Sequence, residues 1–162
     1  MNRTRALTAV ATASTLALTG VVIVSSSTAS ATEQQGPTIV GTWRMTIDPA
    51  GPPPPFVSRI AFGEGGVVTD TVPQAPPVAG ATSATPGLGA WSQKGRTVTF
   101  TFERFLSSAG VYVALQRVTG TATVSQDGQT QAGPATTAFF APNGTPLGAP
   151  LSVEASGSRL NP

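Results

Sequence analysis

The chain contains no histidine and no cysteine, and these two absences exclude several chemistries at once. Nucleophiles activated by a histidine, in Ser-His or Cys-His arrangements, cannot be built from it. Histidine-ligated zinc, haem and non-haem iron are excluded for the same reason. Without cysteine there is no disulfide and no thiolate metal site, so a folded domain must rely on its apolar core.

Charge is also scarce, since only 10% of the 162 residues are Asp, Glu, Lys or Arg. Beyond residue 31 the acidic residues are Glu33, Asp48, Glu64, Asp70, Glu103, Asp127 and Glu154. No two of them have the spacing of a metal loop, and no pair suggests the two converging carboxylates of a glycosidase. No glycine loop precedes a helix in the manner of a phosphate site. We therefore predict no metal, no cofactor and no catalytic residue.

The first 31 residues have the pattern of a secretory signal peptide. Arg3 and Arg5 supply a positive start, residues 6–24 are apolar and uncharged, and Ala29-Ser30-Ala31 fits a signal-peptidase site. An N-terminal membrane anchor is the alternative, because the apolar run is long enough to cross a bilayer. Its Thr, Ser and Ala content and the cleavage site favour a signal that is removed, and therefore a secreted protein.

Removal of that signal would leave a chain with no net charge. The nine basic and seven acidic residues of the whole sequence become seven of each once Arg3 and Arg5 are gone. No basic cluster remains, and Lys94 is the only lysine. We expect no nucleic-acid partner and no stable membrane insertion of the cleaved protein.

The rest of the sequence consists of short alternating runs separated by Gly, Pro, Asn or Asp, as is typical of all-β sandwiches and barrels. After a short flexible N-terminus at 32–37, one domain at 38–162 is expected, because the 131 residues from 32 to 162 are too few for two domains. Eight strands are predicted at 39–47, 56–62, 67–72, 88–93, 96–106, 111–125, 130–141 and 147–160. The proline-rich stretch 49–55 must be a loop.

Two local features complete this prediction. The stretch 73–87 holds four prolines and is predicted to be a long irregular loop, which in a compact domain is functional or disordered. Gly120, within the strand at 111–125, marks an expected bend or bulge.

Alternation along the strand at 96–106 places one arginine among apolar side chains. Phe100, Phe102 and Arg104 share a face with Val98 and Leu106, and the threonines take the opposite face. A buried arginine needs partners, so Arg104 is expected to pair with a Glu or with backbone carbonyls, or to lie at the strand end with its head in water. The alternative is that it holds an anionic oxygen of a ligand in a pocket.

Gly41-Thr42-Trp43 on the first strand, the count of about eight strands, and Arg159 near the end together resemble the lipocalin-like (calycin) β-barrels. The resemblance implies a single antiparallel up-and-down barrel in which Trp43 lies at the closed end and Arg159 packs across it. An arginine stacked on an indole would join the first and last strands as a cation–π contact. Gly41, Trp43 and Arg159 are therefore the expected barrel-closing residues.

The segment GLGAWSQKGRTVTFTFERFL, at 87–106, is also similar to small secreted actinobacterial proteins of lipocalin-like type, a likeness that implies no activity. The sequence departs from classical lipocalins in lacking a helical period and cysteines for disulfides. A nitrobindin-like haem barrel would need a histidine ligand, which is missing. Allene-oxide-cyclase and dirigent-like barrels remain open, since they work through pocket shape and a few polar groups.

The leading hypothesis is a secreted lipocalin-like barrel that binds a small hydrophobic or amphipathic molecule and is not an enzyme. The candidate ligand-binding residues are Trp91, Phe100, Phe102, Arg104 and Tyr112. One alternative is a barrel-type cyclase or isomerase that uses arginine and tyrosine without histidine. Another is a barrel filled by its own side chains that acts through its surface or through the 73–87 loop.

Overall fold

The structure, a computed structural model, describes residues 37–161, so the predicted signal peptide lies outside the described residues. Their strands are β1 (Gly41–Pro49), β2 (Phe56–Phe62), β3 (Val67–Thr71), β4 (Ser83–Ala84), β5 (Gly87–Lys94), β6 (Thr97–Ser108), β7 (Val111–Val124), β8 (Thr130–Phe140) and β9 (Leu151–Arg159). No helix in this part of the chain is long and apolar enough to cross a membrane.

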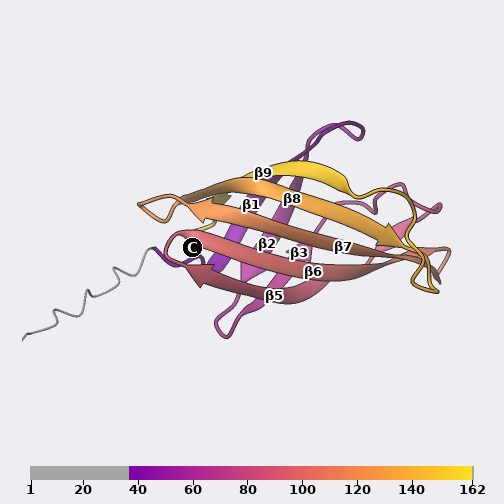
Figure 1. The fold of residues 1–162 in the computed structure, drawn as a ribbon, viewed down its shortest axis with the longest axis horizontal. Coiled ribbons are helices and arrows are strands. Elements are labelled where there is room, and N and C mark those ends of the chain that lie inside the picture. The colour runs from indigo at the N-terminus through magenta and orange to yellow at the C-terminus, as the bar shows by residue number, and fades with distance from the viewer. Residues whose placement is uncertain (1–36, 162) are drawn as a thin grey trace, which may run out of the picture. The chain divides into compact units, whose positions relative to one another are not determined.

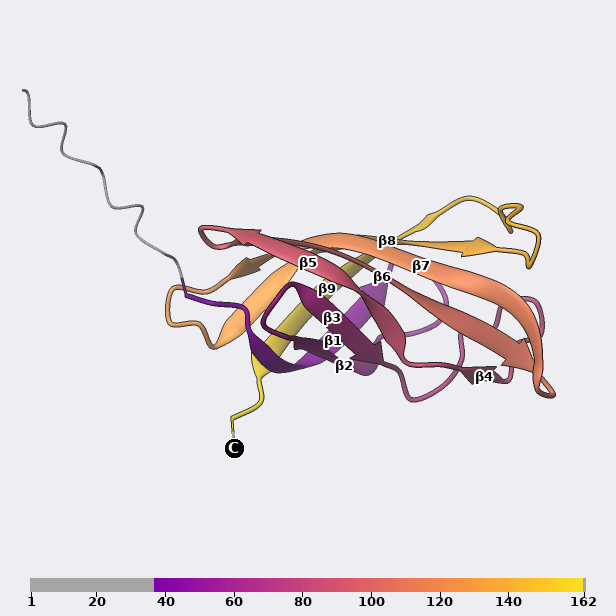
Figure 2. The same cartoon turned by 90° about the horizontal axis from the view of Figure 1, so that it is seen from below.

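Eight of these strands form one closed antiparallel sheet. The hydrogen-bonded order runs β6, β5, β3, β2, β1, β9, β8, β7, and β7 then pairs with β6. Figures 1 and 2 show β5, β6 and β7 side by side on one wall, with β1, β2 and β3 crossing behind them. Because first and last strands pair through β1 and β9, the barrel leaves no edge. The predicted all-β up-and-down barrel is confirmed.

The barrel strands follow the predicted ones closely, and the differences lie at loops. The stretch 73–87 is not wholly irregular, because it contains β4 and its last residue begins β5. β4 pairs with β6 beyond the point where β5 stops, at Ser83↔Ser107 and Ala84↔Leu106. The last strand starts at Leu151 rather than 147, since Pro150 has no N–H to give to a ladder.

The expected bulge at Gly120 is wrong. The β6–β7 register runs unbroken through this residue and shifts between Leu106 and Ser107 instead. Gly120 faces the barrel interior, where an added Cβ would lie 2.7 Å from the Phe100 ring and 2.8 Å from the Ala135 Cβ. The glycine therefore makes room for an aromatic ring on the neighbouring strand.

The interior is filled unevenly along the barrel. At the end where β1, β6 and β8 begin, a large core contains side chains with no exposed surface, among them Ile39, Trp43 and Val98. We call this the closed end. At the opposite end, a smaller cluster of Leu106, Ala114 and Phe139 packs against residues of the 78–84 segment.

Candidate functional site

The first and last strands meet at the closed end through a tryptophan and an arginine. Trp43 and Arg159 are register partners across β1 and β9, and the Arg159 guanidinium carbon lies 4.4 Å from the centre of the Trp43 ring. The indole is fully buried and its N–H donates to the Ile39 carbonyl at 2.9 Å. The contact therefore fixes both the seam of the barrel and its plug.

Arg159 also ties three chain segments together by hydrogen bonds. Its Nε donates to the Gly128 carbonyl at 2.8 Å, its Nη1 to Val40 at 2.5 Å and its Nη2 to Thr38 at 2.6 Å. Gly41 leaves space for this guanidinium, because a Cβ there would lie 2.5 Å from Nη1. Its φ of 135° further favours glycine. The structure thus brings Gly41, Trp43 and Arg159 together.

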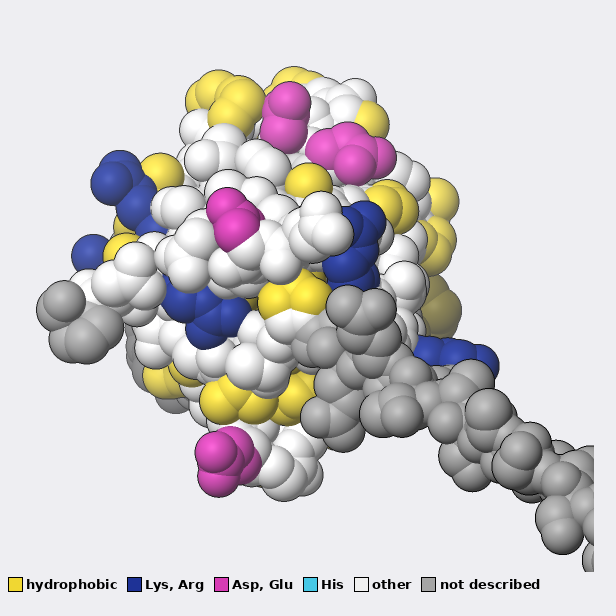
Figure 3. Space-filling model, turned by 90° about the vertical axis from the view of Figure 1, so that its left-hand side faces the viewer, with side chains coloured by type: hydrophobic (Ala, Val, Ile, Leu, Met, Phe, Trp, Pro, Cys, Tyr) yellow, Lys and Arg dark blue, Asp and Glu magenta, His cyan; other side chains and the backbone are white. Residues whose placement is uncertain are grey.

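Figure 3 looks onto this end of the barrel. Outside the grey atoms, white backbone and uncharged polar atoms predominate there, with basic, acidic and scattered apolar side chains among them. The cavity described next is lined from the other end of the strands and from the loops there.

A cavity of about 510 Å³ occupies the other half of the barrel, which we call the open end. Small-molecule sites span about 300–1,000 Å³. Apolar side chains predominate on its walls, and the proline-rich stretches 49–55 and 73–78 lie over it. The wall residues on strands include Met45, Ile47, Ile60, Phe100, Phe102, Val118, Ala135, Phe139, Val153 and Ala155.

Three of the five predicted ligand-binding residues line this cavity, and two do not. Phe100, Phe102 and Arg104 are buried in its wall on β6. Trp91 points inward near the closed end, where its Nε1 donates to the Gly63 carbonyl at 3.0 Å and its ring meets Phe62.

Tyr112 lies outside the cavity, 37% exposed, with its ring 5.5 Å from that of Phe105 at right angles. It belongs to the hairpin of β6 and β7 beyond the register shift at Leu106/Ser107. Alternation counted along the sequence does not reveal that shift, so it could not place Tyr112.

The cavity wall also contains a row of polar side chains that we call the polar belt: Ser58, Asp70, Arg104, Gln116 and Thr137. The Asp70 carboxylate accepts from Arg104 Nη2 on one oxygen and from the Ser58 hydroxyl on the other. Gln116 Nε2 donates to Thr137 Oγ1 at 2.9 Å. Arg104 and Gln116 are register partners on β6 and β7, which joins the two halves of the belt.

A glycine on β5 lets the ion pair form across an intervening strand. Gly87 lies between β3 and β6 and is the register partner of Asp70. A Cβ at Gly87 would come within 2.7 Å of the Phe102 ring and 3.5 Å of the Asp70 Cβ. With a larger residue there, Arg104 and Asp70 would be separated by that side chain.

Sequence reasoning did not identify Asp70, the hydrogen-bond partner of Arg104, or Ser58, which donates to the Asp70 carboxylate. The alternation of side chains could have identified Asp70, because in VVTDTV it is two residues from Val68 and therefore points to the same, inward face. Likewise Ser58 shares the parity of Ile60, and both polar side chains are buried. Of the alternatives left open for Arg104, the structure shows pairing within the protein, but the partner is the carboxylate of Asp70 rather than that of a Glu.

Three buried polar atoms of the belt have no hydrogen-bond partner in the described part of the chain. They are Nε and Nη1 of Arg104 and Oε1 of Gln116. Buried polar groups in proteins are nearly always paired, so unpaired ones need an explanation. Arg104 and Gln116 both line the cavity, and their unpaired atoms are two guanidinium nitrogens that donate and one carbonyl oxygen that accepts.

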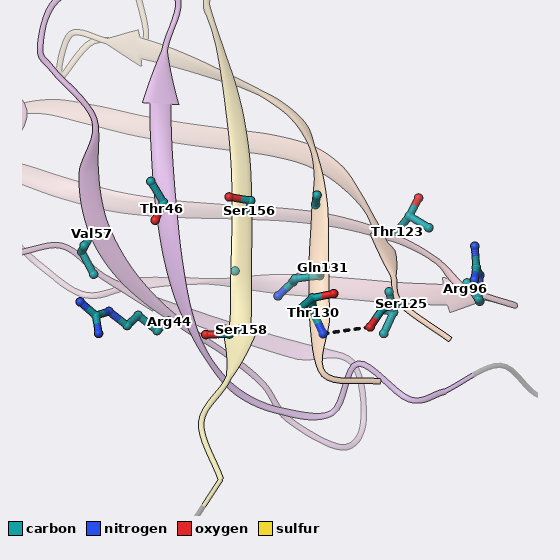
Figure 4. A pocket seen from close by; sticks show the side chains of 13 residues that line it. Arg44, Thr46, Val57, Arg96, Thr123, Ser125, Thr130, Gln131, Ser156 and Ser158 are labelled. Carbon is teal, nitrogen blue, oxygen red and sulfur yellow. Dashed lines mark hydrogen bonds between the residues drawn. The ribbon is translucent and has the colours of Figure 1, made fainter. Parts of the chain in front are cut away.

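A second hollow is an open groove on the outside of the barrel (Figure 4), spanning β1, β2, β7, β8 and β9. Arg44 and Arg96 lie on two sides of it, and most of the other labelled side chains are hydroxyls, with Thr130 hydrogen-bonded to Ser125. None of the unpartnered buried atoms found in residues 37–161 lies in this groove. The cavity is accordingly the stronger candidate.

The fold and this site define a closed eight-stranded antiparallel barrel with an apolar cavity and a buried, charge-balanced polar belt. Residues 37–161 contain no group of three or more carboxylates that could hold a metal ion. Comparison with protein-family models, with curated proteins and with solved structures gave no match for this chain. Its function is therefore inferred from its own residues.

Proposed function

We propose that the barrel binds one small, largely apolar molecule in its cavity and does not alter it chemically. The observation that carries this proposal is the cavity of about 510 Å³ with apolar walls and an unsatisfied polar belt. Water in such a space would be released by an apolar ligand, which favours binding at about 25 cal/mol per Å² of apolar surface buried.

Partly exposed wall residues support the proposal. Val118, Val153 and Ala155 point into the barrel, yet they are only partly buried. Inward side chains of a filled barrel would be packed on all sides. Their exposed surface faces the cavity, where a ligand would cover it.

Neither alternative function has an observation in its favour. A cyclase that combines arginine with tyrosine would need a tyrosine in the cavity, but the only tyrosine of the chain, Tyr112, lies outside it. A barrel filled by its own side chains is difficult to reconcile with the cavity volume. The likeness to lipocalin-like barrels fits the proposal as far as the closed barrel goes.

The test is to measure binding of a neutral apolar probe to the protein and to a variant with a smaller cavity. Val118→Phe adds a ring on the inward face of β7, and Thr119→Phe adds the same ring to the outward face of the next residue. We expect native mass spectrometry and calorimetry to show one probe per chain, lost in Val118→Phe and retained in Thr119→Phe. Equal binding by both variants would contradict the cavity as the site.

We also propose that the protein acts outside the cell, on the strength of the signal pattern in residues 1–31. The test is the intact mass of the protein in the culture medium. A chain that begins at Thr32 is expected, whereas an uncut chain in the membrane fraction would instead support the anchor.

A further inference from the structure

The charges in the cavity wall cancel. Asp70 and Arg104 are the only ionisable side chains among the residues that line it, and they form a buried ion pair with exposures of 5% and 2%. The site therefore has no excess positive charge. A carboxylate entering it would add an unpaired negative charge near Asp70, in surroundings where charge is poorly solvated.

The hydrogen-bonding groups that remain free point to a different kind of head group. Asp70 accepts a hydrogen bond from Nη2 of Arg104 only, and Nε and Nη1 have no partner. Gln116 has given its amide N–H to Thr137, which leaves its carbonyl oxygen without a partner. Since these two residues are register partners, the donors and the acceptor belong to one stretch of wall.

A ligand that satisfies both residues must carry an acceptor and a donor close together. A carboxamide has this arrangement, with a carbonyl oxygen for Arg104 and an N–H for Gln116. A carboxylate has acceptors only, so it would leave the Gln116 oxygen unpaired as well as adding charge. An unmet buried polar group costs about 1–3 kcal/mol.

We infer that the polar belt selects an apolar molecule with a neutral, amide-like head group and discriminates against carboxylates. Asp70 sets this selectivity by neutralising Arg104, and Gln116 contributes the acceptor. The inference rests on the proposed function, because it concerns the ligand of the same cavity. It replaces the expectation that Arg104 holds an anion.

The experiment compares decanamide, 2-decanone and decanoate, three probes with similar apolar chains, by calorimetry at pH 7 on the mature chain. Decanamide is expected to bind at least about tenfold more tightly than decanoate, because the carboxylate is both unpaired and charged. Decanoate binding should rise when the pH is lowered until the probe is protonated. That second measurement needs no variant.

The variant Asp70→Asn is expected to shift the preference from decanamide towards decanoate. It removes the negative charge and leaves the Arg104 guanidinium unbalanced, so decanoate is expected to gain at least about tenfold relative to decanamide. If the variant does not fold, Gln116→Leu keeps the inference testable. It should weaken decanamide, which has an N–H donor, by a larger factor than 2-decanone, which has none.

The outcomes separate the two proposals. If decanoate binds the unaltered protein as tightly as decanamide, the selectivity is wrong while the binding function stands. If the preference stays the same in Asp70→Asn, or if Gln116→Leu weakens both neutral probes equally, the roles given to these residues are overturned. If no probe binds at either pH, the proposed function fails, and the selectivity fails with it.

Discussion

The two ends of the barrel are built on the same eight strands, yet one is packed and the other is hollow. At the closed end, Trp43 fills the interior and Arg159 seals the seam over it. At the open end, aliphatic and phenylalanine side chains and two proline-rich stretches surround a cavity of about 510 Å³. Side chains alternate between the inward and outward faces of the strands at both ends, so this pattern does not distinguish the packed end from the hollow one.

Side-chain size and partner geometry make the difference. At the closed end the Trp43 N–H donates to a carbonyl and the Arg159 guanidinium donates to three. Within residues 37–161, no unpaired buried side-chain nitrogen or oxygen lies at that end. In the belt at the open end, by contrast, Arg104 and Gln116 keep unpaired atoms. The comparison indicates that the closed end contributes stability, and it agrees with the proposal that the open end holds a ligand.

The largest expected effect is on the plug. Trp43→Ala should lower the free energy of unfolding by about 3–5 kcal/mol, as for other buried aromatic side chains replaced by alanine. Chemical denaturation measures this. Trp91→Ala is the matched control, and its smaller loss reflects the partial exposure of that ring. Equal losses would contradict the distinction between a plug and a peripheral tryptophan.

The second-largest loss of unfolding free energy is expected from Arg159, at the seam between β1 and β9. Arg159→Met removes the hydrogen bonds to three carbonyls and the contact with the Trp43 ring, with an expected loss of about 2–3 kcal/mol in unfolding free energy. Arg159→Lys keeps the charge but not the planar fork, so it should recover only part of this. Probe binding at the open end should stay unchanged in both variants. Weaker probe binding in either variant would mean that a change at the closed end affects the cavity at the open end.

Gly41→Ala tests the space left for the seam. The added Cβ would clash with Arg159 Nη1, and the residue would keep an unfavourable positive φ. A loss of about 1–3 kcal/mol is expected from backbone strain alone. Gly95→Ala is a useful control, because its φ is also positive while nothing lies near its added Cβ. A similar loss of unfolding free energy in both variants would show that the clash with Arg159 does not contribute.

At the open end, a substitution in the cavity wall should change binding strongly and stability little. Val118→Phe is expected to change the unfolding free energy by less than about 1 kcal/mol, because the cavity can hold the ring without overpacking. The same substitution is expected to abolish probe binding. A large destabilisation, measured by the same denaturant titration, would show that the wall at Val118 is already tightly packed.

The smallest effect concerns a turn at the closed end. The Ser125 hydroxyl and the Gln129 backbone N–H donate to Asp127, and these bonds lower the pKa of its carboxyl below the ordinary 3.8. A lowered pKa means that the contribution to stability is present above the unfolded-state pKa and is lost as the pH falls through the folded-state value. An NMR titration of the carboxyl should show the lowered pKa, and Ser125→Ala should raise it. An unchanged titration in Ser125→Ala would contradict the assigned cause.

The sequence by itself determined the local part of this protein. Alternation in VTFTFERFL placed Phe100, Phe102 and Arg104 on the inward face, since side chains of a strand alternate between faces. The turns, the all-β class and the excluded chemistries followed from composition and spacing, whereas the closed barrel came from a family resemblance. The pairing of Trp43 with Arg159 came from a family resemblance rather than from the residues alone.

Only the tertiary structure decided what the interior contains. Asp70 and Arg104 are 34 residues apart and meet across a third strand, because Gly87 has no side chain to keep them separate. Tyr112 lies outside the predicted site because the register of β6 and β7 shifts between Leu106 and Ser107. Whether a barrel is hollow depends on how the side chains of all eight strands add up in three dimensions, and alternation records only which way each one points.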